Sequence, residues 1–428
     1  MRLRKQLSNY EQREKYVVNI LYFGTVCDLM SYEEILQNCK ARPTVATIVF
    51  ESALLEGFRN NGVDMSICSF PMIPTFPKSH LLRFGGKEEL LPSGYTCQWL
   101  KTINLPFFKQ LTRNTDAKRI IKKWAKKNGD SGVILTYSIP PFLVKTITKL
   151  SKKYDVKTVA IVPDLPHNMY INHKTNFLVK ALRNLYLNGS LKYCDSYDGY
   201  VYLTKAMHDT IAPRKPHIVM EGILNESELH LTETCKASPR AIMYAGRLHE
   251  KYGVINLLKA FEMLENVDAE LWFFGDGTAV EQIKAYSEKN SCIRYFGRVT
   301  REEILQYEKK ATLLVNPRSV KDEFTKYSFP SKTIEYMYSG TPLLTTKLEG
   351  IPPEYFDYVF AVEDNEPRLL AQAMQNVLLL SAEALFEKGR AAQQFISDNK
   401  NATEQVRRIK NFLLDLLGKK YEIRKNSF

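Results

Sequence analysis

Short apolar runs rich in valine, isoleucine and aromatic residues alternate along the chain with longer stretches in which apolar residues recur every three or four positions. The short runs predict buried strands, and the longer stretches predict amphipathic helices. In the first half, strands are predicted at 17–23, 64–69, 132–137, 158–162 and 199–203, and helices at 45–60, 118–128 and 141–153. Strands that alternate with helices in this way form a parallel sheet covered by helices.

The same alternation begins again in the second half of the chain. Strands are predicted at 241–244, 270–274, 293–296, 313–315 and 342–345, and three helical segments follow between 366 and 417. Residues 224–240, between the two halves, are polar and lack periodicity, which predicts a linker.

A chain of 428 residues exceeds the size at which one hydrophobic core usually keeps growing. The predicted fold class is therefore α/β, with two Rossmann-like doubly wound domains that face each other across a cleft. The predicted limits are 1–225 for an N-terminal domain, 226–415 for a C-terminal domain and 416–428 for a basic tail. Ligands bind outside the carboxyl ends of the strands in such sheets, so the site is expected there.

Composition narrows the class of protein. The seven cysteines are scattered and fit neither a disulfide framework nor a zinc site. Glu11 and Glu14 precede the first apolar run, which makes it a poor signal peptide, and no apolar run reaches the roughly 20 residues of a spanning helix. A cytoplasmic protein is expected. Its net charge of +13 attracts phosphates on nucleic acid, nucleotide sugars or anionic lipids.

Basic residues are concentrated between positions 109 and 127, where they alternate with Leu111, Ile120, Ile121 and Trp124. This pattern predicts a basic amphipathic helix. One interpretation places the apolar stripe on an anionic membrane surface. The other turns the stripe toward the core of the protein and leaves the lysines in solvent.

The first motif with chemical content is a glycine turn between a strand and a helix. Gly246 and Arg247 follow a predicted strand, and free backbone N–H groups at the start of the next helix would suit a phosphate. Arg247 could clamp a diphosphate with two hydrogen bonds, or it could be a structural arginine paired with a carboxylate. Gly275 ends the next predicted strand in a Gly-Asp-Gly turn on the same side.

The strongest motif runs from Val315 to Leu344 and reads as strand, polar loop, short helix and new strand. Lys332 lies at the predicted helix start, where the helix dipole disfavours a cation unless an anion is shared with the free amides. Glu335 lies one turn later and could grip the two hydroxyls of a ribose. The alternative for Glu335 is an exposed carboxylate paired with Lys332 or Lys326.

These segments together resemble the retaining glycosyltransferases of family 4, which have the GT-B fold, and the similarity runs over most of the chain. The resemblance implies that the turn at Gly246 and Arg247 clamps the donor diphosphate, that Glu335 holds the ribose and that Lys332 contacts the diphosphate. The Phe-Pro-Ser-Lys-x-x-Glu-Tyr variant resembles a bacterial subgroup that builds surface polysaccharides. The donor-binding residues implied are Gly246, Arg247, Lys251, Gly275, Arg318, Tyr327, Ser328, Phe329, Pro330, Ser331, Lys332, Thr333 and Glu335.

The chain departs from the family pattern at two positions. Tyr327 stands where the family has the first of two glutamates, and Glu323 could replace that glutamate only if the loop folds back. Tyr252 stands where the family has a lysine before a glycine, with Lys251 one position earlier. The basic role is therefore assigned to Lys332 first and Lys251 second.

In the first half, Asp164 and His167 follow a predicted strand in a loop stiffened by Pro163 and Pro166. Either side chain could orient an acceptor hydroxyl or the reacting sugar. A capping aspartate and a surface histidine remain the alternative. Further candidates for the acceptor rim, chosen by their position after strands or before a helix, are Gly24, Thr25, Thr44, Tyr137 and Ser138.

The leading hypothesis is a glycosyltransferase that moves a hexose-type sugar from a nucleoside diphosphate to a saccharide or lipid-linked saccharide, with retention as the resemblance implies. Arg247 and Lys332 would offset charge on the leaving diphosphate, and Asp164, His167, Arg247 and Lys332 are the catalytic candidates. No DxD-like motif is present, so neither a metal nor a cofactor is expected. The protein is expected in the cytoplasm, with peripheral contact to the inner face of the plasma membrane.

Two rival hypotheses remain. A nucleotide-sugar epimerase also pairs two domains of this class and would form an epimer without an acceptor. A nucleic-acid or membrane-binding protein would use the positive charge alone. Because the basic residues lack interleaved stacking aromatics on a known nucleic-acid module, a nucleic-acid partner is not expected.

Overall fold

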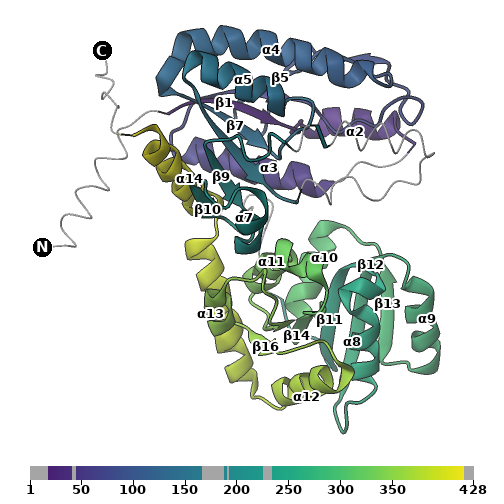
Figure 1. Cartoon of the computed structure of the whole chain (residues 1–428). Coiled ribbons are helices and arrows are strands. Elements are labelled where there is room, and N and C mark those ends of the chain that lie inside the picture. The colour runs from purple at the N-terminus through teal and green to yellow at the C-terminus, as the bar shows by residue number, and fades with distance from the viewer. Residues whose placement is uncertain (1–17, 41–44, 166–187, 190–191, 225–233, 419–428) are drawn as a thin grey trace, which may run out of the picture. The chain divides into compact units, whose positions relative to one another are not determined.

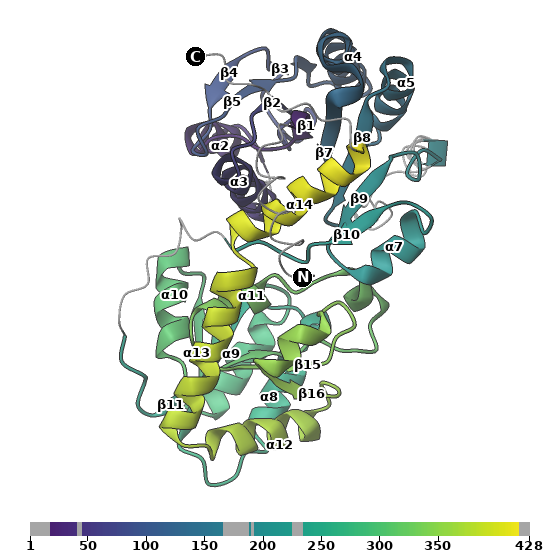
Figure 2. The ribbon, with the colours of Figure 1, turned by 90° about the vertical axis from the view of Figure 1, so that its left-hand side faces the viewer.

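The computed structural model describes residues 18–40, 45–165, 188–189, 192–224 and 234–418, and these residues fall into two compact units. Unit 1 comprises Met1–Met220 together with Ala402–Phe428, and unit 2 comprises Glu221–Asn401. Each unit has its own β-sheet with helices on its faces (Figure 1, Figure 2).

Unit 1 is built on an eight-stranded sheet in the order β10-β9-β8-β7-β1-β2-β5-β4. Its strands are parallel except for β4, which pairs antiparallel with β5. A separate antiparallel ribbon joins β3 to β6. The strands are β1 (Asn19–Gly24), β2 (Met65–Ser69), β3 (Arg83–Phe84), β4 (Glu88–Leu90), β5 (Thr96–Trp99), β6 (Thr102–Ile103), β7 (Gly132–Tyr137), β8 (Lys157–Val162), β9 (Gly199–Tyr202) and β10 (His217–Val219).

Helices on the faces of this sheet bury its apolar side chains. Strands β1 and β7 are almost wholly buried, as expected for central parallel strands covered on both faces. The helices are α2 (Leu29–Gln37), α3 (Val45–Asn60), α4 (Phe108–Asn128), α5 (Val144–Tyr154), α7 (Lys205–Ile211) and α14 (Ala402–Leu417), with the 3₁₀ turn η1 (Gly129–Ser131).

Unit 2 contains a six-stranded parallel sheet in the order β13-β12-β11-β14-β15-β16. The strands are β11 (Arg240–Arg247), β12 (Ala269–Asp276), β13 (Ile293–Gly297), β14 (Leu313–Asn316), β15 (Leu343–Thr346) and β16 (Phe360–Val362). The helices are α8 (Val254–Phe261), α9 (Val280–Lys289), α10 (Arg301–Lys310), α11 (Lys332–Tyr338), α12 (Pro367–Leu378) and α13 (Ala382–Asn399), with 3₁₀ turns η4 (Glu250–Tyr252), η5 (Glu323–Tyr327) and η6 (Pro353–Asp357).

The sheet of unit 2 separates two hydrophobic cores. Successive side chains of a strand point to opposite faces, so Ile242 and Tyr244 enter one core while Met243 and Ala245 enter the other. Helices α8, α9 and α12 complete the first core, and α11 and α13 complete the second. The predicted α/β class with two Rossmann-like domains is confirmed by these two parallel sheets.

The last helix does not belong to the second unit. Helix α14 packs on α3, where a Cβ at Gly57 would lie 2.3 Å from the carbonyl oxygen of Ala402. Its apolar stripe, which includes Val406, Ile409 and Leu413, is buried. The predicted C-terminal domain at 226–415 is therefore corrected to end at Asn401, because this stripe completes the core of unit 1.

The predicted linker at 224–240 lies partly outside the described residues, and its last residues belong to unit 2. The chain first passes from one unit to the other between Met220 and Glu221, close to the predicted boundary at 225. The predicted tail at 416–428 begins inside α14, and residues beyond 418 are outside the description.

The basic segment at 109–127 forms most of α4. Ile121 is fully buried and Trp124 is half-buried, so this part of the stripe faces the core as the second interpretation has it, whereas Leu111 is 61% exposed. Lys109 and Arg113 also point inward and donate to the carbonyl oxygens of Ile73 and Pro71. Burial lowers the pKa of Lys109 to about 7.

Within the described residues, no single helix is both long and apolar enough to cross a membrane. Only α12 and α13 taken together reach that length and composition, and they are bent by 109° relative to each other. Their apolar side chains, including Leu370, Met374 and Ile396, fill the two cores of unit 2.

Candidate functional site

The parallel pairing of β11 and β12 in unit 2 continues to the carboxyl ends of both strands, where each has a glycine. Gly246 pairs with Gly275, and a Cβ at Gly275 would lie only 1.8 Å from the carbonyl oxygen of Gly246. Gly275 also has a φ of 122°, which L side chains rarely adopt. Two glycines therefore leave bare backbone at this end of the sheet.

Arg247 is the last residue of β11, and its side chain is exposed. Its carbonyl oxygen accepts a hydrogen bond from the Tyr244 hydroxyl at 3.2 Å. Among the described residues, its guanidinium has no hydrogen-bond or ion-pair partner. The structural alternative, an arginine paired with a carboxylate, is therefore not what the structure shows.

Lys332 reaches the same strand end from the first residue of α11. A Cβ at Gly246 would lie 3.5 Å from Lys332 Cε. The Tyr336 hydroxyl fixes α11 against β11, because it accepts from Ala245 N at 2.8 Å and donates to Ala245 O at 2.9 Å. Two sequence motifs far apart in the chain are thus brought together as expected.

Helix α11 differs from the prediction at its start. It has seven residues, and two of its first amides are already used: Thr333 N donates to Pro330 O at 2.8 Å and Ile334 N to Ser331 O at 3.2 Å. The expectation of free amides beside Lys332 is therefore corrected, because the first turn closes on its own backbone.

Glu335 lies next to Lys332, with Oε1 of Glu335 3.8 Å from Lys332 Nζ. Both side chains are partly exposed, at 22% and 35% respectively. Lys326 pairs instead with Glu349 at 3.5 Å. The pairing of Glu335 with Lys332 that the spacing allowed is present, and it leaves the carboxylate open to solvent on one side.

Arg318 follows β14 and lies 5.1 Å from the ring centre of Tyr252. Its Nη1 is buried and lacks a partner in the described part of the chain. Burial lowers the pKa of Arg318, and nearby Tyr244 acts in the opposite direction. The side chain of Asn365 holds the preceding residue, because its Nδ2 donates to Pro317 O at 3.0 Å.

Lys251 lies against the same tyrosine, with Nζ 5.1 Å from the Tyr252 ring centre and 5.5 Å from that of Phe324. Tyr252, which stands in place of the family lysine, therefore packs its ring against the side chains of Lys251 and Arg318. With Lys332 and Arg247, these residues make the carboxyl ends of β11 and β14 strongly cationic.

The loop before α11 contributes both surface and core. Tyr327 and Ser328 are half-buried and Ser331 is exposed. Phe329 is 6% exposed and packs on Tyr355 at 5.5 Å between ring centres, and Pro330 is also buried. Phe329 and Pro330 therefore build the core beneath the loop and present no side chain to a ligand.

Glu308 is a residue that sequence reasoning missed. Its side chain is fully buried in α10, and neither carboxylate oxygen has a hydrogen-bond partner among the described residues. Burial and the charge of Glu335 raise the pKa of Glu308, while Lys332 lowers it. No sequence signal marks it, because it occupies an ordinary polar position of a charged helix.

In unit 1, the backbone after β1 is held by a buried carboxylate, Glu51 of α3. Thr25 donates to it through both its backbone N, at 2.9 Å, and its hydroxyl, and Tyr22 donates at 2.6 Å. A Cβ at Gly24 would lie 2.0 Å from Glu51 Oε2. Burial raises the pKa of Glu51 to about 7 against the effect of these donors.

The other described acceptor candidates lie at the same edge of the sheet, since β1, β7 and β8 are parallel neighbours. Tyr137 is buried, and burial and the nearby Glu51 raise its pKa. Ser138 has a φ of 63°, and its N donates to Ile161 O at 2.7 Å. Asp164 is exposed. His167 and Thr44 lie outside the described residues.

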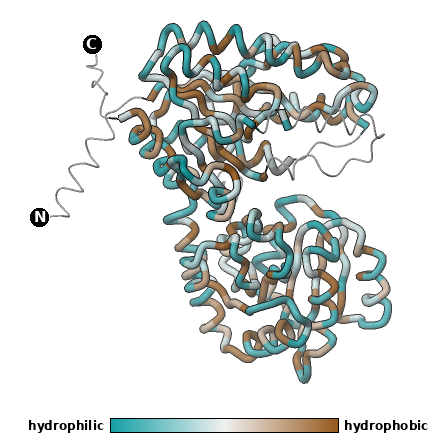
Figure 3. Tube along the Cα trace, in the orientation of Figure 1, coloured by the Kyte–Doolittle hydropathy of each residue, from teal (hydrophilic) through white to brown (hydrophobic). Residues whose placement is uncertain are grey.

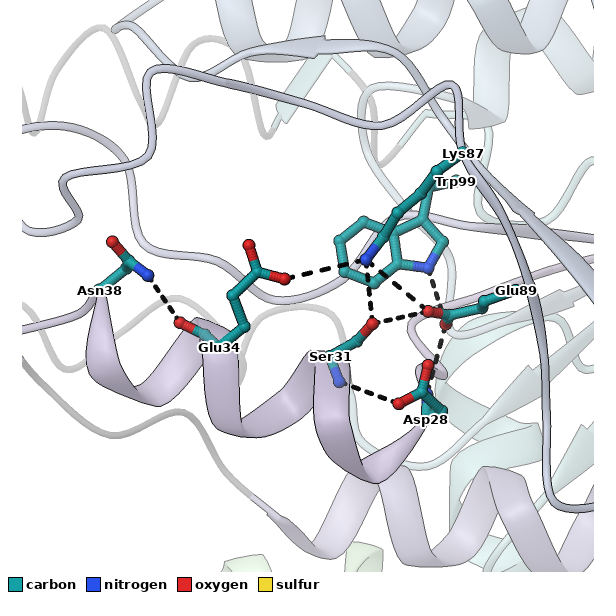
Figure 4. Close-up of polar contacts among 7 residues, drawn as sticks. All are labelled: Asp28, Ser31, Glu34, Asn38, Lys87, Glu89 and Trp99. Atoms are coloured by element: carbon teal, nitrogen blue, oxygen red, sulfur yellow. Dashed lines mark hydrogen bonds and ion pairs between the residues drawn. The ribbon is translucent and has the colours of Figure 1, made fainter.

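A polar network around the start of α2 was also missed (Figure 4). Glu89 accepts from Trp99 Nε1 at 2.8 Å, from Ser31 Oγ at 2.7 Å and from Asp28 N at 3.2 Å. Lys87 covers the Trp99 ring at 4.2 Å. These contacts tie the start of α2 to β4 and β5.

A small hollow adjoins that loop. It lies between α2, α3 and the loops after β1 and β2, and its lining is mostly apolar. The lining residues are Thr25, Cys27, Tyr32, Ile35, Thr47, Ile48, Pro71 and Met72.

Comparison with known proteins places this geometry in a family context. Residues 239–379 match the family model described as Glycosyl transferases group 1. A segment of 62 residues is 32% identical to the probable glycosyltransferase WbjE of Pseudomonas aeruginosa, covering 14% of this chain and 16% of that protein.

Solved structures resemble the whole chain at low sequence identity. Sucrose-phosphate synthase from Thermosynechococcus elongatus superposes with a TM-score of 0.61 at 14% identity, covering 93% of this chain and 99% of that one. Anabaena HepE in complex with UDP gives 0.58 at 12%, and the lipopolysaccharide outer core galactosyltransferase WaaB gives 0.58 at 11%; each covers 92% of this chain and 99% of its own.

These likenesses agree with the parallel sheets of the two units. The glycine turn and the cationic residues at the strand ends of unit 2 lie within the segment that matches the family model, since Gly246, Arg318 and Lys332 all fall within 239–379. Residues 239–379 therefore match the model of group 1 glycosyl transferases, in a chain that has the GT-B fold.

Proposed function

We propose that this chain is a glycosyltransferase that takes a sugar from a nucleoside diphosphate and transfers it to a saccharide or a lipid-linked saccharide. The observation that carries the proposal is that Arg247 ends β11 at the glycine turn and that the Lys332 side chain reaches the same turn. Arg247 has no protein partner in the described residues, and Lys332 comes within van der Waals reach of Gly246. Two cations beside bare backbone suit a diphosphate.

The two cations would act most strongly as the bond to the sugar breaks. Negative charge then develops on the leaving diphosphate, and preorganised donors offset it without reorganisation. Arg318 and Lys251 add positive charge next to Tyr252. The proposal therefore assigns this step to side chains of unit 2, with neither a metal nor a cofactor.

Glu335 is proposed to hold the ribose of the donor. Its carboxylate is 22% exposed and 3.8 Å from Lys332 Nζ, so it can accept from two adjacent hydroxyls while the lysine meets the phosphates. HepE, whose fold is similar, was solved with UDP and with UDP and glucose, which supports a nucleotide-sugar donor here.

The acceptor is proposed to bind at the carboxyl ends of β1, β7 and β8 in unit 1. Asp164 is the exposed acid at this edge and is the proposed group that orients an acceptor hydroxyl or the reacting sugar. We further propose retention of configuration and a role in surface polysaccharide synthesis in the cytoplasm. The likeness to WbjE and WaaB supports that role. The epimerase alternative is not favoured, because the family match is to glycosyl transferases.

The donor assignment can be tested by binding and by turnover. A panel of nucleoside diphosphate sugars should raise the melting temperature of the wild type for at least one member, because ligand binding stabilises the folded state by mass action. With that donor, Arg247→Ala and Lys332→Ala should each lower kcat about a hundredfold. The anomeric configuration of the product, read by NMR, tests retention.

Matched controls separate a local effect from a change in net charge. Arg390→Ala and Lys289→Ala remove one exposed cation each from α13 and α9 and should leave kcat unchanged. A folded Arg247→Ala or Lys332→Ala protein with full activity would refute the donor site. Formation of an epimer without acceptor would favour the rival enzyme class.

A further inference from the structure

The first turn of α4 in unit 1 holds large apolar side chains in solvent. Phe107 is 82% exposed, Phe108 54% and Leu111 61%. Phe108 and Leu111 are three positions apart and therefore share one face of the helix. Scattered single apolar residues are normal on a surface, but three together mark an interaction site.

A neighbouring loop enlarges this apolar surface. Asn104 O accepts from Phe76 N at 3.1 Å, and Asn104 N donates to Leu82 O at 2.8 Å, so both residues are held beside the segment that leads into α4. Phe76 is 41% exposed and Leu82 is 49% exposed. Backbone hydrogen bonds therefore keep apolar side chains from two segments near one another.

The backbone at Phe107 is strained in a way that folding does not explain. Phe107 has a φ of 64° and a ψ of −44°, and Phe108 N donates to Pro106 O at 2.8 Å. This is a γ-turn with a positive φ at its central residue, the less common form of the γ-turn, and it is costly in energy for a bulky side chain. Because Phe107 is 82% exposed, its ring adds nothing to the packing of the core. The strained backbone therefore points to a function of this residue other than stabilising the fold.

Exposed cations continue the same face of α4 beyond the apolar turn. Lys118, Lys122 and Lys126 follow Leu111 at spacings that keep them on one side of the helix, and all three are exposed. Asp116, the acid of this helix, is buried and bonded to Lys101 N and to Arg119. Figure 3 shows hydrophilic and hydrophobic residues alternating along α4.

Helix α5 widens the positive surface. It lies beside α4 in both views of the ribbon, and Thr146 of α5 donates to Asn114 of α4 at 2.6 Å (Figure 1, Figure 2). Its exposed cations are Lys145, Lys149, Lys152 and Lys153.

We propose that this face, defined by Phe107, Phe108, Leu111, Lys118, Lys122 and Lys126, docks unit 1 on an anionic lipid bilayer. The aromatic and leucine side chains enter the boundary between headgroups and acyl chains, and the lysines contact the phosphates. A nucleic acid would use the lysines but would leave Leu111 and the phenylalanines in water. An anionic bilayer uses both halves of the face.

This arrangement differs from the membrane contact expected from the sequence. There the stripe of Leu111, Ile120, Ile121 and Trp124 was the lipid-facing side, whereas the structure buries Ile121 in the protein and leaves only Leu111 of these four exposed. The proposal also stands apart from the donor site, since vesicle binding requires no turnover.

Co-sedimentation of the full chain with vesicles tests the charged half of the face. Binding is expected with phosphatidylcholine vesicles that contain phosphatidylglycerol and not with phosphatidylcholine alone. Lys118→Gln, Lys122→Gln and Lys126→Gln combined should weaken binding about a hundredfold, since each lysine near an anionic surface contributes about a factor of five. Lys259→Gln, Lys284→Gln and Lys289→Gln in unit 2 change the net charge equally and should leave binding unchanged.

A second set of variants tests the apolar half. Phe107→Ser, Phe108→Ser and Leu111→Ser combined should abolish the binding that survives high salt, whereas Leu379→Ser with Phe386→Ser, exposed residues of unit 2, should not. Phe107→Gly should raise the melting temperature by relieving the turn and still weaken vesicle binding. Opposite signs in these two measurements identify a residue kept for docking.

Three results would overturn the proposal. The first is absence of binding to the anionic vesicles, and the second is an equal loss of vesicle binding in the test and control variants. The third is binding to DNA that is tighter than binding to vesicles and that the combined serine variant leaves unchanged. The last result would assign the basic face to a nucleic acid.

Discussion

Glu51 offers a sharp test of the physical reasoning, because its carboxyl group is fully buried in unit 1 and yet accepts hydrogen bonds from the Tyr22 hydroxyl and from the amide and hydroxyl of Thr25. Replacement by glutamine keeps the size of the side chain and one acceptor oxygen for Thr25 but removes the titration. The amide can donate to the Tyr22 hydroxyl in exchange. Glu51→Gln should therefore fold with the loop after β1 in place.

The magnitude follows from the pKa. Burial raises the pKa of Glu51 from 4.5 to about 7, so the folded state binds a proton more tightly than the unfolded state. The stabilisation is fully present below pH 4.5 and is lost as the pH rises through 7. Between pH 5.5 and 8 the wild type should lose about 2 kcal/mol in the free energy of unfolding of unit 1 from this group.

Urea denaturation followed by tryptophan fluorescence measures this difference. In a Trp272→Phe background the remaining tryptophans, Trp99 and Trp124, both belong to unit 1, so the signal reports that unit alone. Glu51→Gln should remove the loss of about 2 kcal/mol between pH 5.5 and 8. Glu33→Gln, at an exposed position of α2, serves as the control and should keep it. An unchanged or inverted pH dependence in Glu51→Gln would refute the assignment.

Three further predictions concern unit 2. Gly275→Ala should destabilise it by about 3 kcal/mol or more in urea denaturation, because the new Cβ meets the carbonyl oxygen of Gly246 at 1.8 Å; wild-type stability would contradict the packing described. Lys400→Ala should lower the free energy of unfolding by about 3 kcal/mol in urea denaturation, because Glu221 is buried and loses its ion pair at 2.5 Å. A loss below about 1 kcal/mol would argue against a buried ion pair at this position. Tyr336→Phe removes both hydrogen bonds to Ala245 and should lower the free energy of unfolding by about 2 kcal/mol. It should also lower the affinity for the sugar donor in calorimetry, and an unchanged affinity would show that the position of α11 does not matter for donor binding.

Much of the fold could be predicted because local pattern and final structure agree. The strand at β7 and the helix α3 have the predicted limits, since an unbroken apolar run and a regular helical period each leave little choice. The two parallel sheets and the glycosyltransferase class of residues 239–379 were likewise predicted and confirmed. Short elements such as the ribbon of β3 and β6 were missed, because two residues carry no period.

The candidate site divides in the same way. Gly246 and Arg247 could be named from the sequence because a glycine turn after a strand has a local signature, and Lys332 could be named because it lies at a predicted helix start. The residues around them could not be named. Tyr336 bonds the backbone of Ala245, and Glu308 is buried near Lys332 and Glu335, through contacts that exist only after α10 and α11 pack on the sheet.

The sequence by itself determined the alternation of the longer strands and helices, the two-sheet class and the glycine and lysine motifs, because these depend on neighbours a few positions away. Tertiary structure alone decided that α14 completes unit 1, that α4 turns Ile121 inward and Phe107 outward, and which amides at α11 are free. Burial and hydrogen bonding depend on residues remote in the chain, so no local pattern contains them.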